Sequence, residues 1–215
     1  AEENNKVDAV TPFSTRCGGI TSITVNTPLV ISGCDLKKVT VKSWGYAGGL
    51  VGMAFGASTA VSIEQSSFSG TVDSKSGGAT AGLATGSNNA EITVDNCRVE
   101  ATLDGNEVEE FQQNCEYPFI STGTVKNSTA NVTFTRMAAI FPSSDSSGAN
   151  SAEDCTVNAK FATDTDIDQQ HFLGYAVYTQ STTFKNCTVT VVLAESTTDV
   201  TLSAYRRKNG DDAKK

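Results

Sequence analysis

The chain has 215 residues, with 24 acidic and 16 basic side chains, so its formal net charge is −8. This excess of negative charge argues against nucleic acid as the main partner, because phosphate binding needs clustered Lys and Arg. No apolar run approaches the roughly 18 residues of a membrane-spanning helix, so the sequence predicts no membrane span.

Residues 1–16 are polar and lack periodicity, which predicts an N-terminal leader or cap. The chain begins AEENN without Met, as a mature secreted protein or a trimmed chain does. The first recognisable repeat unit starts with CGGI at 17–20 and reaches Cys34 through LVISGC. From there on Thr, Ser, Gly, Asn and Val dominate, a composition that is typical of strands and turns.

One small residue recurs at a nearly constant distance along the chain and gives the sequence its repeat. Successive members of this set, the anchor residues, are 32, 31, 31, 27 and 32 residues apart. The anchor residues are Cys34, Ser66, Cys97, Ser128, Cys155 and Cys187. A spacing of 20 to 50 residues indicates a stack of similar structural units, each of which packs on its neighbours.

Alternating residues follow each anchor. After Cys97, the apolar Val99, Ala101 and Leu103 alternate with polar residues, and the other units repeat this pattern. A period of two predicts a strand with one buried face. After Cys34 the pattern slips, because Lys38 falls on an inward position, and we expect a β-bulge or an irregular terminal coil there.

Two further strands are expected in each unit. One precedes the anchor, and its inward residues are Leu29, Ile31, Val61, Ile63, Ile92, Val94, Val125, Ala152 and Phe184. The other carries the tetrads CGGI (17–20), AGGL (47–50), TAGL (80–83), PFIS (118–121), MAAI (137–140) and HFLG (171–174). Three short strands per unit of about 31 residues predict an all-β fold, a three-sided parallel β-helix (β-solenoid) of about six coils with corner-loop insertions. Asn96, Asn127, Asp154 and Asn186 should stack at one corner as a polar ladder.

The largest predicted insertion covers residues 104–117, and smaller polar ones cover 143–150 and 164–170. Such loops are expected at corners, where function usually lies in a repetitive scaffold. The predicted organisation is therefore a leader or cap at 1–16, a β-solenoid domain at 17–205 and a charged, disordered tail at 206–215.

The stretch AGGLVGMAFG (47–56), followed by SSFSGTV (66–72), resembles the GLUG repeat of bacterial secreted and surface proteins. A more degenerate version covers residues 80–103. The resemblance implies a β-solenoid segment of an extracellular or cell-surface protein, of the kind that occurs in adhesins. It transfers no catalytic residue, because the repeat motif contains none.

Few residues are candidates for catalysis or metal binding. His171 is the only histidine, which excludes a His-based metal cluster, and the simplest interpretation is a surface side chain beside an acidic loop. The aspartates of that loop, Asp164, Asp166 and Asp168, have calcium-loop spacing but lack the Gly and the distal Glu of an EF-hand. We therefore predict no catalytic residue, no cofactor and no metal ligand.

Three outward residues could serve a carbohydrate-active enzyme, namely Arg98, Glu100 and Lys160. Isolated charges on an outward sheet are more often solubilising, and we favour that interpretation. An antifreeze-like array of outward threonines is a third alternative, which the same three charges are expected to interrupt. The sequons at Asn127, Asn131 and Asn186 matter only in a eukaryotic secretory host.

Glycines and aromatic residues near the first unit have two interpretations each. Gly48, Gly49 and Gly52 could cradle a phosphate, but no nucleotide-binding pattern surrounds them, and close packing between coils is the better hypothesis. Trp44 and Tyr46 could stack on a sugar or cover the apolar end of the solenoid, and we favour the second.

A stack of this size can bury a core without a disulfide framework. We therefore expect Cys97, Cys155 and Cys187 to be buried thiols, whereas the pattern leaves Cys17 and Cys115 open.

The patterns predict a non-enzymatic module, and the resemblance to GLUG repeats implies that it lies outside the cell or on the bacterial cell surface and acts as an adhesin, spacer or binding scaffold. Its expected partners are glycans, host surface proteins or copies of itself. The alternative is a carbohydrate-active β-helix enzyme, a polysaccharide lyase or hydrolase.

Overall fold

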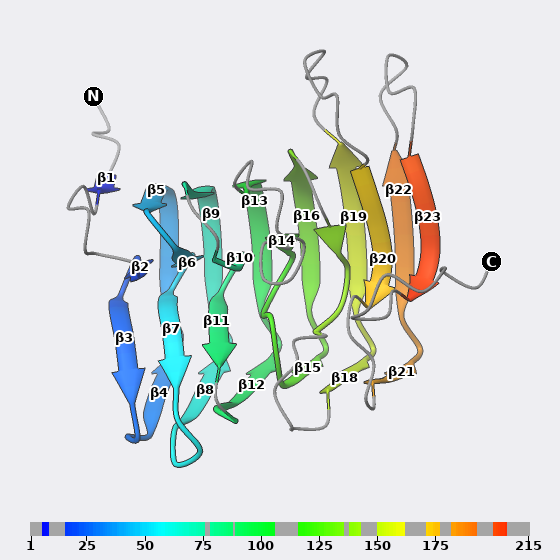
Figure 1. Cartoon of the computed structure of the whole chain (residues 1–215). Helices are drawn as coiled ribbons and strands as arrows, with labels where there is room; N and C mark the ends of the chain where they lie inside the picture. The colour runs from blue at the N-terminus through cyan, green and yellow to red at the C-terminus, as the bar shows by residue number, and fades with distance from the viewer. Residues whose placement is uncertain are drawn as a thin grey trace.

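The computed structural model describes residues 6–8, 16–75, 78–87, 89–105, 116–135, 138–142, 150–161, 171–176, 182–192 and 200–205 (Figure 1). All strand pairs in these residues are parallel, and the described residues contain no helix. The predicted class, an all-β parallel β-solenoid, is confirmed.

Four sheets form the solenoid. Sheet A contains β1 (Lys6–Asp8), β5 (Asp35–Ser43), β9 (Ser67–Ser74), β13 (Arg98–Asp104), β16 (Thr129–Phe134), β19 (Thr156–Phe161) and β22 (Thr188–Val192). Sheet B contains β2 (Arg16–Gly18), β6 (Tyr46–Gly48), β10 (Thr80–Ala81), β14 (Glu116–Tyr117), β17 (Ala138–Ala139), β20 (His171–Ala176) and β23 (Val200–Tyr205). Sheet D contains β4 (Leu29–Ser32), β8 (Ala60–Glu64), β12 (Glu91–Asp95), β15 (Thr124–Lys126), β18 (Asn150–Glu153) and β21 (Thr182–Lys185). Sheet C is short, with β3 (Thr21–Val25), β7 (Val51–Phe55) and β11 (Ala84–Ser87).

Each coil passes through sheet B, then sheet D, then sheet A, and the next coil stacks beside it (Figure 1). Three strands per coil were expected, and from β14 onward the described coils have three. The coils before β14 differ, because sheet C adds a fourth strand to each of them. Strand β1, which lies inside the stretch expected as a leader or cap, extends sheet A beyond β5. The predicted tail at 206–215 lies outside the described residues.

The corner between sheets D and A repeats one backbone conformation in every coil. Its residues have φ between 47° and 64°, which is the left-handed region. They are Gly33, Gln65, Asn96, Asn127, Asp154 and Asn186. Gly, Asn and Asp tolerate this region best, so the expected corner column is confirmed. The Nδ2 group of Asn127 donates a hydrogen bond to Oδ1 of Asp95 at 2.8 Å, rather than to the next corner residue.

The anchor residues come directly after these corners and stack in register, as predicted. The hydroxyl of Ser128 donates a hydrogen bond to the carbonyl of Lys126 at 2.6 Å and accepts the N–H of Cys97 at 3.0 Å. The anchor thiols donate in the same way, as Cys97 does to the carbonyl of Asp95 at 3.3 Å. Small polar side chains thus satisfy backbone groups at a buried corner.

The described cysteines are all free thiols, including Cys17. Cys97 and Cys155 are buried as predicted, whereas Cys187 is only half-buried. Burial raises the pKa of the Cys155 thiol to about 11, so this thiol is neutral and unreactive near pH 7. Cys115 lies outside the described residues.

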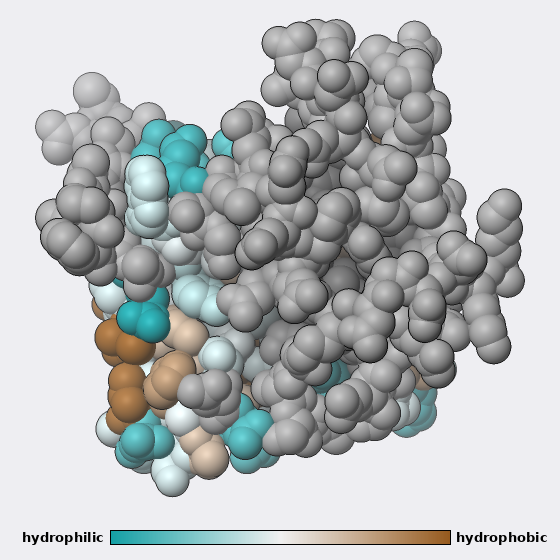
Figure 2. All heavy atoms as spheres, in the orientation of Figure 1, coloured by the Kyte–Doolittle hydropathy of each residue, from teal (hydrophilic) through white to brown (hydrophobic). Residues whose placement is uncertain are grey.

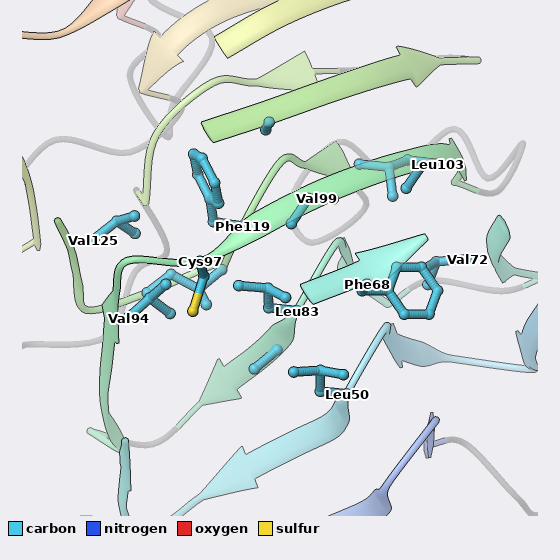
Figure 3. Close-up of a cluster of buried hydrophobic side chains, with 14 of the residues drawn as sticks. Leu50, Phe68, Val72, Leu83, Val94, Cys97, Val99, Leu103, Phe119 and Val125 are labelled. Carbon is cyan, nitrogen blue, oxygen red and sulfur yellow. The ribbon is translucent and has the colours of Figure 1, made fainter. Parts of the chain in front are cut away.

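The core fills the space between the sheets. The innermost column of sheet A is formed by Val41, Val72, Leu103, Phe134 and Phe161. Leu50, Leu83 and Phe119, from the bend after sheet B, belong to the same core cluster, as do Val94 and Val125 of sheet D, which lie near Cys97 (Figure 3). The predicted inward residues of sheet D are buried in the central coils, while Phe184, on the edge strand β21, is 41% exposed.

The expected β-bulge is present in β5. Leu36 pairs with Phe68 and Val39 pairs with Gly70, so two residues of β5 oppose one residue of β9. Lys38 adopts a φ of 55° there. A Cβ atom at Gly70 would lie 1.9 Å from the carbonyl oxygen of Val39, so the bulge requires a glycine opposite it.

The predicted alignment of sheet B is correct only for the first three tetrads. Thr80 pairs with Glu116, Glu116 with Ala138, and Ala138 with Leu173. The tetrads that follow 80–83 are therefore 116–119, 138–141 and 173–176, so the predicted ones are displaced by two, one and two residues. The first error has a clear cause, because a charged residue, Glu116, occupies the inward position that Cys17, Ala47 and Thr80 have in the first three tetrads.

Candidate functional site

The outer face of sheet A is the largest regular polar surface of the described coils. We define it by Thr40, Ser67, Ser69, Thr71, Arg98, Glu100, Thr102, Thr129, Asn131, Thr133, Thr156, Asn158, Lys160, Thr188 and Thr190. These side chains alternate with the buried residues of the same strands, and they stack in three columns along the solenoid.

Within this face, like side chains stand next to each other on neighbouring strands. Nδ2 of Asn158 donates a hydrogen bond to Oδ1 of Asn131 at 2.9 Å. One column contains Thr40, Thr71, Thr102 and Thr133 in register, and Lys160 is its next member. The expected interruption of this column comes from Lys160 alone, because Arg98 and Glu100 lie in other columns.

The three charged residues of the enzyme alternative do not converge. The Arg98 guanidinium forms an ion pair with the Glu100 carboxylate on the same strand, and both side chains are exposed. Lys160 stacks with Thr133 and Thr102, whereas Glu100 stacks with Asn131 and Asn158. An exposed ion pair of this kind contributes about 0–1 kcal/mol to stability.

A second polar cluster, which the sequence pattern did not reveal, lies at the corner between sheets A and B. Its central residue is Glu116, whose side chain is fully buried. Oε1 of Glu116 accepts the N–H of Gly105 at 2.7 Å, and Oε2 accepts the N–H of Thr135 at 3.0 Å. The predicted insertion 104–117 is too long, because Asp104 ends β13 and Glu116–Tyr117 form β14. Gly105 and Glu116 are the described residues on either side of residues 106–115, so this carboxylate joins the two described ends of that segment. The signal in the sequence was a charged residue at an inward position directly after the insertion.

Two more carboxylates lie at the same corner. Asp73 and Asp104 are paired in register on β9 and β13, and Oδ1 of Asp104 accepts the hydroxyl of Thr135 at 2.9 Å. Oδ2 of Asp73 lies 3.3 Å from Nζ of Lys75 and 3.7 Å from Nζ of Lys42. Within the described part of the chain, Oδ1 of Asp73 is buried and has no hydrogen-bond partner. Among the described residues, no three His, Cys, Asp or Glu side chains gather in a way that could hold a metal ion.

The glycines near the first repeat pack coil against coil. A Cβ atom at Gly49 would lie 2.1 Å from the carbonyl oxygen of Gly82 in the next coil, and one at Gly52 would lie 2.4 Å from that of Ser22 in the preceding coil. At Gly48 the nearest atom is the carbonyl oxygen of Val51 in the same coil, at 2.0 Å. The N–H groups of Gly49 and Leu50 donate to the carbonyls of Ala81 and Leu83 in the next coil. Because these donors are occupied by the stack, the geometry supports close packing over the phosphate-binding alternative.

The two aromatic residues near this repeat lie in different environments. Trp44 is 51% exposed, whereas Tyr46 is half-buried against Ala79, Ala81 and Tyr117. Burial raises the pKa of the Tyr46 phenol. Tyr46 therefore contributes to packing, and of these two aromatic residues only Trp44 has an exposed ring.

Several predicted positions lie outside the described residues. Asp164, Asp166 and Asp168 lie outside the described residues, as do most of the insertions, and only the backbone of His171 is described, in β20. Asn127, Asn131 and Asn186 of the three sequons are exposed.

Models of known protein families, curated proteins and solved structures give no match to this chain. Among the described residues, no helix has the length and apolar character to cross a membrane.

Proposed function

We propose that the chain is a non-enzymatic β-solenoid module located outside the cell or on the bacterial cell surface, where it acts as an adhesin, spacer or binding scaffold. The outer face of sheet A is the observation that carries this proposal. It displays hydroxyl and amide groups at the strand spacing of about 4.8 Å. The backbone donors and acceptors beneath them are used by neighbouring coils, so the display is rigid.

The chemistry of this face favours a glycan as the ligand. Sugars offer arrays of hydroxyl groups, which pair with amide and hydroxyl side chains such as Asn131, Asn158 and Thr129. A preorganised surface also loses little conformational entropy when it binds. The resemblance to GLUG repeats agrees with this proposal, since such repeats occur in secreted and surface proteins.

Glycan-array binding followed by calorimetry tests the proposal. The double variant Asn131→Ala/Asn158→Ala should weaken binding of a captured glycan at least tenfold. The matched control is Thr93→Ala/Thr124→Ala on the outer face of sheet D, which should bind as the wild type does. Equal loss in both variants, or no binding to any glycan or surface protein, would contradict the proposal.

One observation favours the alternative of a carbohydrate-active enzyme, namely the paired carboxylates of Asp73 and Asp104. Glycoside hydrolysis requires two carboxyl groups on either side of the scissile bond. In this chain Asp73 is buried and paired with Lys75, and Asp104 is bonded to Thr135. We therefore expect no release of reducing or unsaturated ends from acidic or neutral polysaccharides. Release that disappears in both Asp73→Asn and Asp104→Asn would establish the enzyme instead.

A further inference from the structure

The anchor column contains two cysteines in succession at one place. From Cys34 to Cys155 cysteine alternates with serine, so Cys97 has a serine in the coil on either side of it. Cys155 is followed in the next coil by Cys187, and the residues after these two, Thr156 and Thr188, are paired in register. Among the described anchors, only Cys155 and Cys187 can therefore bring two thiols of neighbouring coils together.

Backbone hydrogen bonds hold the two coils together on both sides of this pair. The N–H of Thr188 donates to the carbonyl of Cys155 at 2.8 Å, and the N–H of Asp154 donates to the carbonyl of Lys185 at 3.0 Å. The strands before and after the corner are both paired in register. The separation of the two cysteine backbones is therefore fixed by the sheet.

The two side chains have the same orientation. Sγ of Cys155 donates a hydrogen bond to the carbonyl of Glu153 at 3.2 Å, and Sγ of Cys187 donates one to the carbonyl of Lys185 at 3.4 Å. Each thiol thus contacts the carbonyl two residues before it. The thiols of Cys155 and Cys187 are also in hydrogen-bond contact with each other, so the two sulfur atoms meet between the coils.

The spacing of the strands suits a bond between these sulfur atoms. A disulfide needs Cα atoms about 4.4–6.8 Å apart and Cβ atoms about 3.5–4.5 Å apart. Neighbouring strands lie about 4.8 Å apart, so the Cα requirement is met and the Cβ atoms have to approach by a few tenths of an ångström. This approach strains the bond, and strained disulfides are the ones that are easily reduced again.

We propose that Cys155 and Cys187 are a reversible redox pair, which a small-molecule disulfide such as oxidised glutathione converts into a disulfide between two neighbouring coils. The Cys187 thiolate attacks one sulfur of the reagent, which forms a mixed disulfide and releases one glutathione thiolate. The Cys155 thiolate then attacks the Cys187 sulfur and releases the second glutathione thiolate. The two protein thiols lose two electrons, which reduce the disulfide of the reagent, and their two protons pass to the released thiolates.

Burial determines the order of the two steps. Cys187 is half-buried, whereas Cys155 is 1% exposed, so a reagent from solvent reaches Cys187 first. Burial raises the pKa of the Cys155 thiol to about 11, which makes Cys155 a poor nucleophile towards a reagent in solution. Its reaction is assigned to the second step, because the Cys187 sulfur is already beside it and the attack is intramolecular.

Peptide mapping of the full chain without reductant tests this proposal. The reduced protein is treated with oxidised glutathione, its remaining thiols are alkylated, and the protein is digested. Two of the six thiols should be lost, and one linked peptide should contain Cys155 and Cys187. A glutathione adduct that stays on Cys187, a link to any other cysteine, or no reaction would each overturn the proposal.

Two variants give the matched comparison. Cys187→Ser should form no link at Cys155, which is buried and then has a serine in the coil on either side. Cys97→Ser removes a buried anchor thiol of the same column and should form the link between Cys155 and Cys187 as the wild type does. Loss of the link in Cys97→Ser would show that the pair does not react by itself.

Hydrogen exchange of the wild type gives a second readout. Amides of β22 should gain protection at least threefold when the link forms, and reductant should reverse this gain. The control is β3 in the first coil, at the left of Figure 2, where Ile23 is 39% exposed, and its exchange should not change. Equal changes in β3 and β22 would contradict the proposed position of the link. These experiments do not involve glycan binding, so their failure leaves the function proposed for sheet A intact.

Discussion

The coils before β14 and the coils from β14 onward differ in the bend that follows sheet B. In the earlier coils the bend after sheet B contains Gly19, Gly49 and Gly82, and the chain continues into a strand of sheet C. In the later coils the equivalent positions are Pro118 and Ile140, and sheet C is reduced to one bridge between Ala84 and Ile120. The bend with glycines is therefore followed by a strand of sheet C, whereas the bend with side chains is followed by a single bridge at most in the described residues.

The side chains that fill the bend change with the backbone. Leu50 and Leu83 occupy the inward position of the earlier coils, and Phe119 and Phe141 occupy it in the later ones. Glycine allows backbones to approach at the bend, so a leucine is large enough to complete the core there. At Phe119 and Phe141 an aromatic ring occupies the position that a leucine side chain has in the earlier coils, and both rings are 1% exposed.

The largest expected effect is the loss of an aromatic side chain from the later coils. Phe134 is fully buried, and its ring centroid lies 5.8 Å from that of Phe161. Phe134→Ala should lower the free energy of unfolding by about 3–5 kcal/mol, because it removes buried apolar surface and leaves a cavity. Urea denaturation measures this change. The control Thr133→Ala, on the outer face of the same strand, should change it by less than about 0.5 kcal/mol. Similar losses in both would show that Phe134 is not a core residue.

In the earlier coils, adding a methyl group should be nearly as damaging as removing a ring from the later ones. Gly49→Ala places a Cβ atom 2.1 Å from the carbonyl oxygen of Gly82, and a backbone atom cannot rotate away. We expect a loss of about 3 kcal/mol, at the upper end of overpacking effects. Gly33→Asn is the matched control, since nothing lies within 4 Å of a Cβ atom there and Asn tolerates its φ of 64°. Equal stability of wild type and Gly49→Ala would mean that the coils can separate at the bend at little cost.

Period-two alternation and anchor spacing were sufficient to predict sheets A and D, their register and the bulge at Lys38. These features depend on local rules that each coil obeys, namely one buried face per strand and a left-handed residue before each anchor. Sheet B was misaligned after residue 83, because its strands in β10, β14 and β17 are only two residues long and carry almost no pattern. Sheet C was not predicted, since it depends on contacts between coils at the glycine bend.

The role of Glu116 at the polar corner could not be predicted from the sequence, because it also depends on contacts with distant residues. Its carboxylate binds Gly105 and Thr135, which are 11 and 19 residues away in the sequence, so no local pattern could identify its role. The outer face of sheet A, in contrast, follows directly from the alternation, because every second residue after an anchor must point outward. The candidate binding surface was therefore implicit in the sequence, whereas the buried carboxylate required the structure.

The corner at Glu116 marks the change from one kind of coil to the other, and Glu116→Gln tests its contribution. Gln keeps the shape but replaces one acceptor oxygen with an amide donor, which would face the N–H of Gly105 or Thr135. We expect a loss of about 2 kcal/mol in the free energy of unfolding, as for other hydrogen bonds to charged groups. The exposed Glu100→Gln is the control and should be close to neutral. An unchanged denaturation midpoint in Glu116→Gln would mean that the loop ends are held by other contacts.

The smallest expected effect lies in the anchor column, where, in the described coils, a hydroxyl accepts an anchor N–H only where a serine follows a cysteine. The hydroxyls of Ser66 and Ser128 accept the N–H of Cys34 and Cys97 in the preceding coil, at 3.1 Å and 3.0 Å. Cys155 is followed in the column by Cys187, whose thiol donates to the carbonyl of Lys185 at 3.4 Å. Cys187→Ser supplies a better acceptor to the N–H of Cys155 and should raise the free energy of unfolding by about 1 kcal/mol.

Thermal denaturation of Cys187→Ser beside Cys34→Ser separates this bond from a general effect of removing a thiol. Cys34 is the first anchor, so the described coils contain no preceding anchor whose N–H a side chain at this position could accept. Cys34→Ser should therefore not raise the free energy of unfolding. Ser128→Cys should show the reverse of the Cys187→Ser change, since it removes the acceptor of the Cys97 N–H. If Cys34→Ser stabilised the protein as much as Cys187→Ser, the gain would come from the hydroxyl itself and not from the bond between coils.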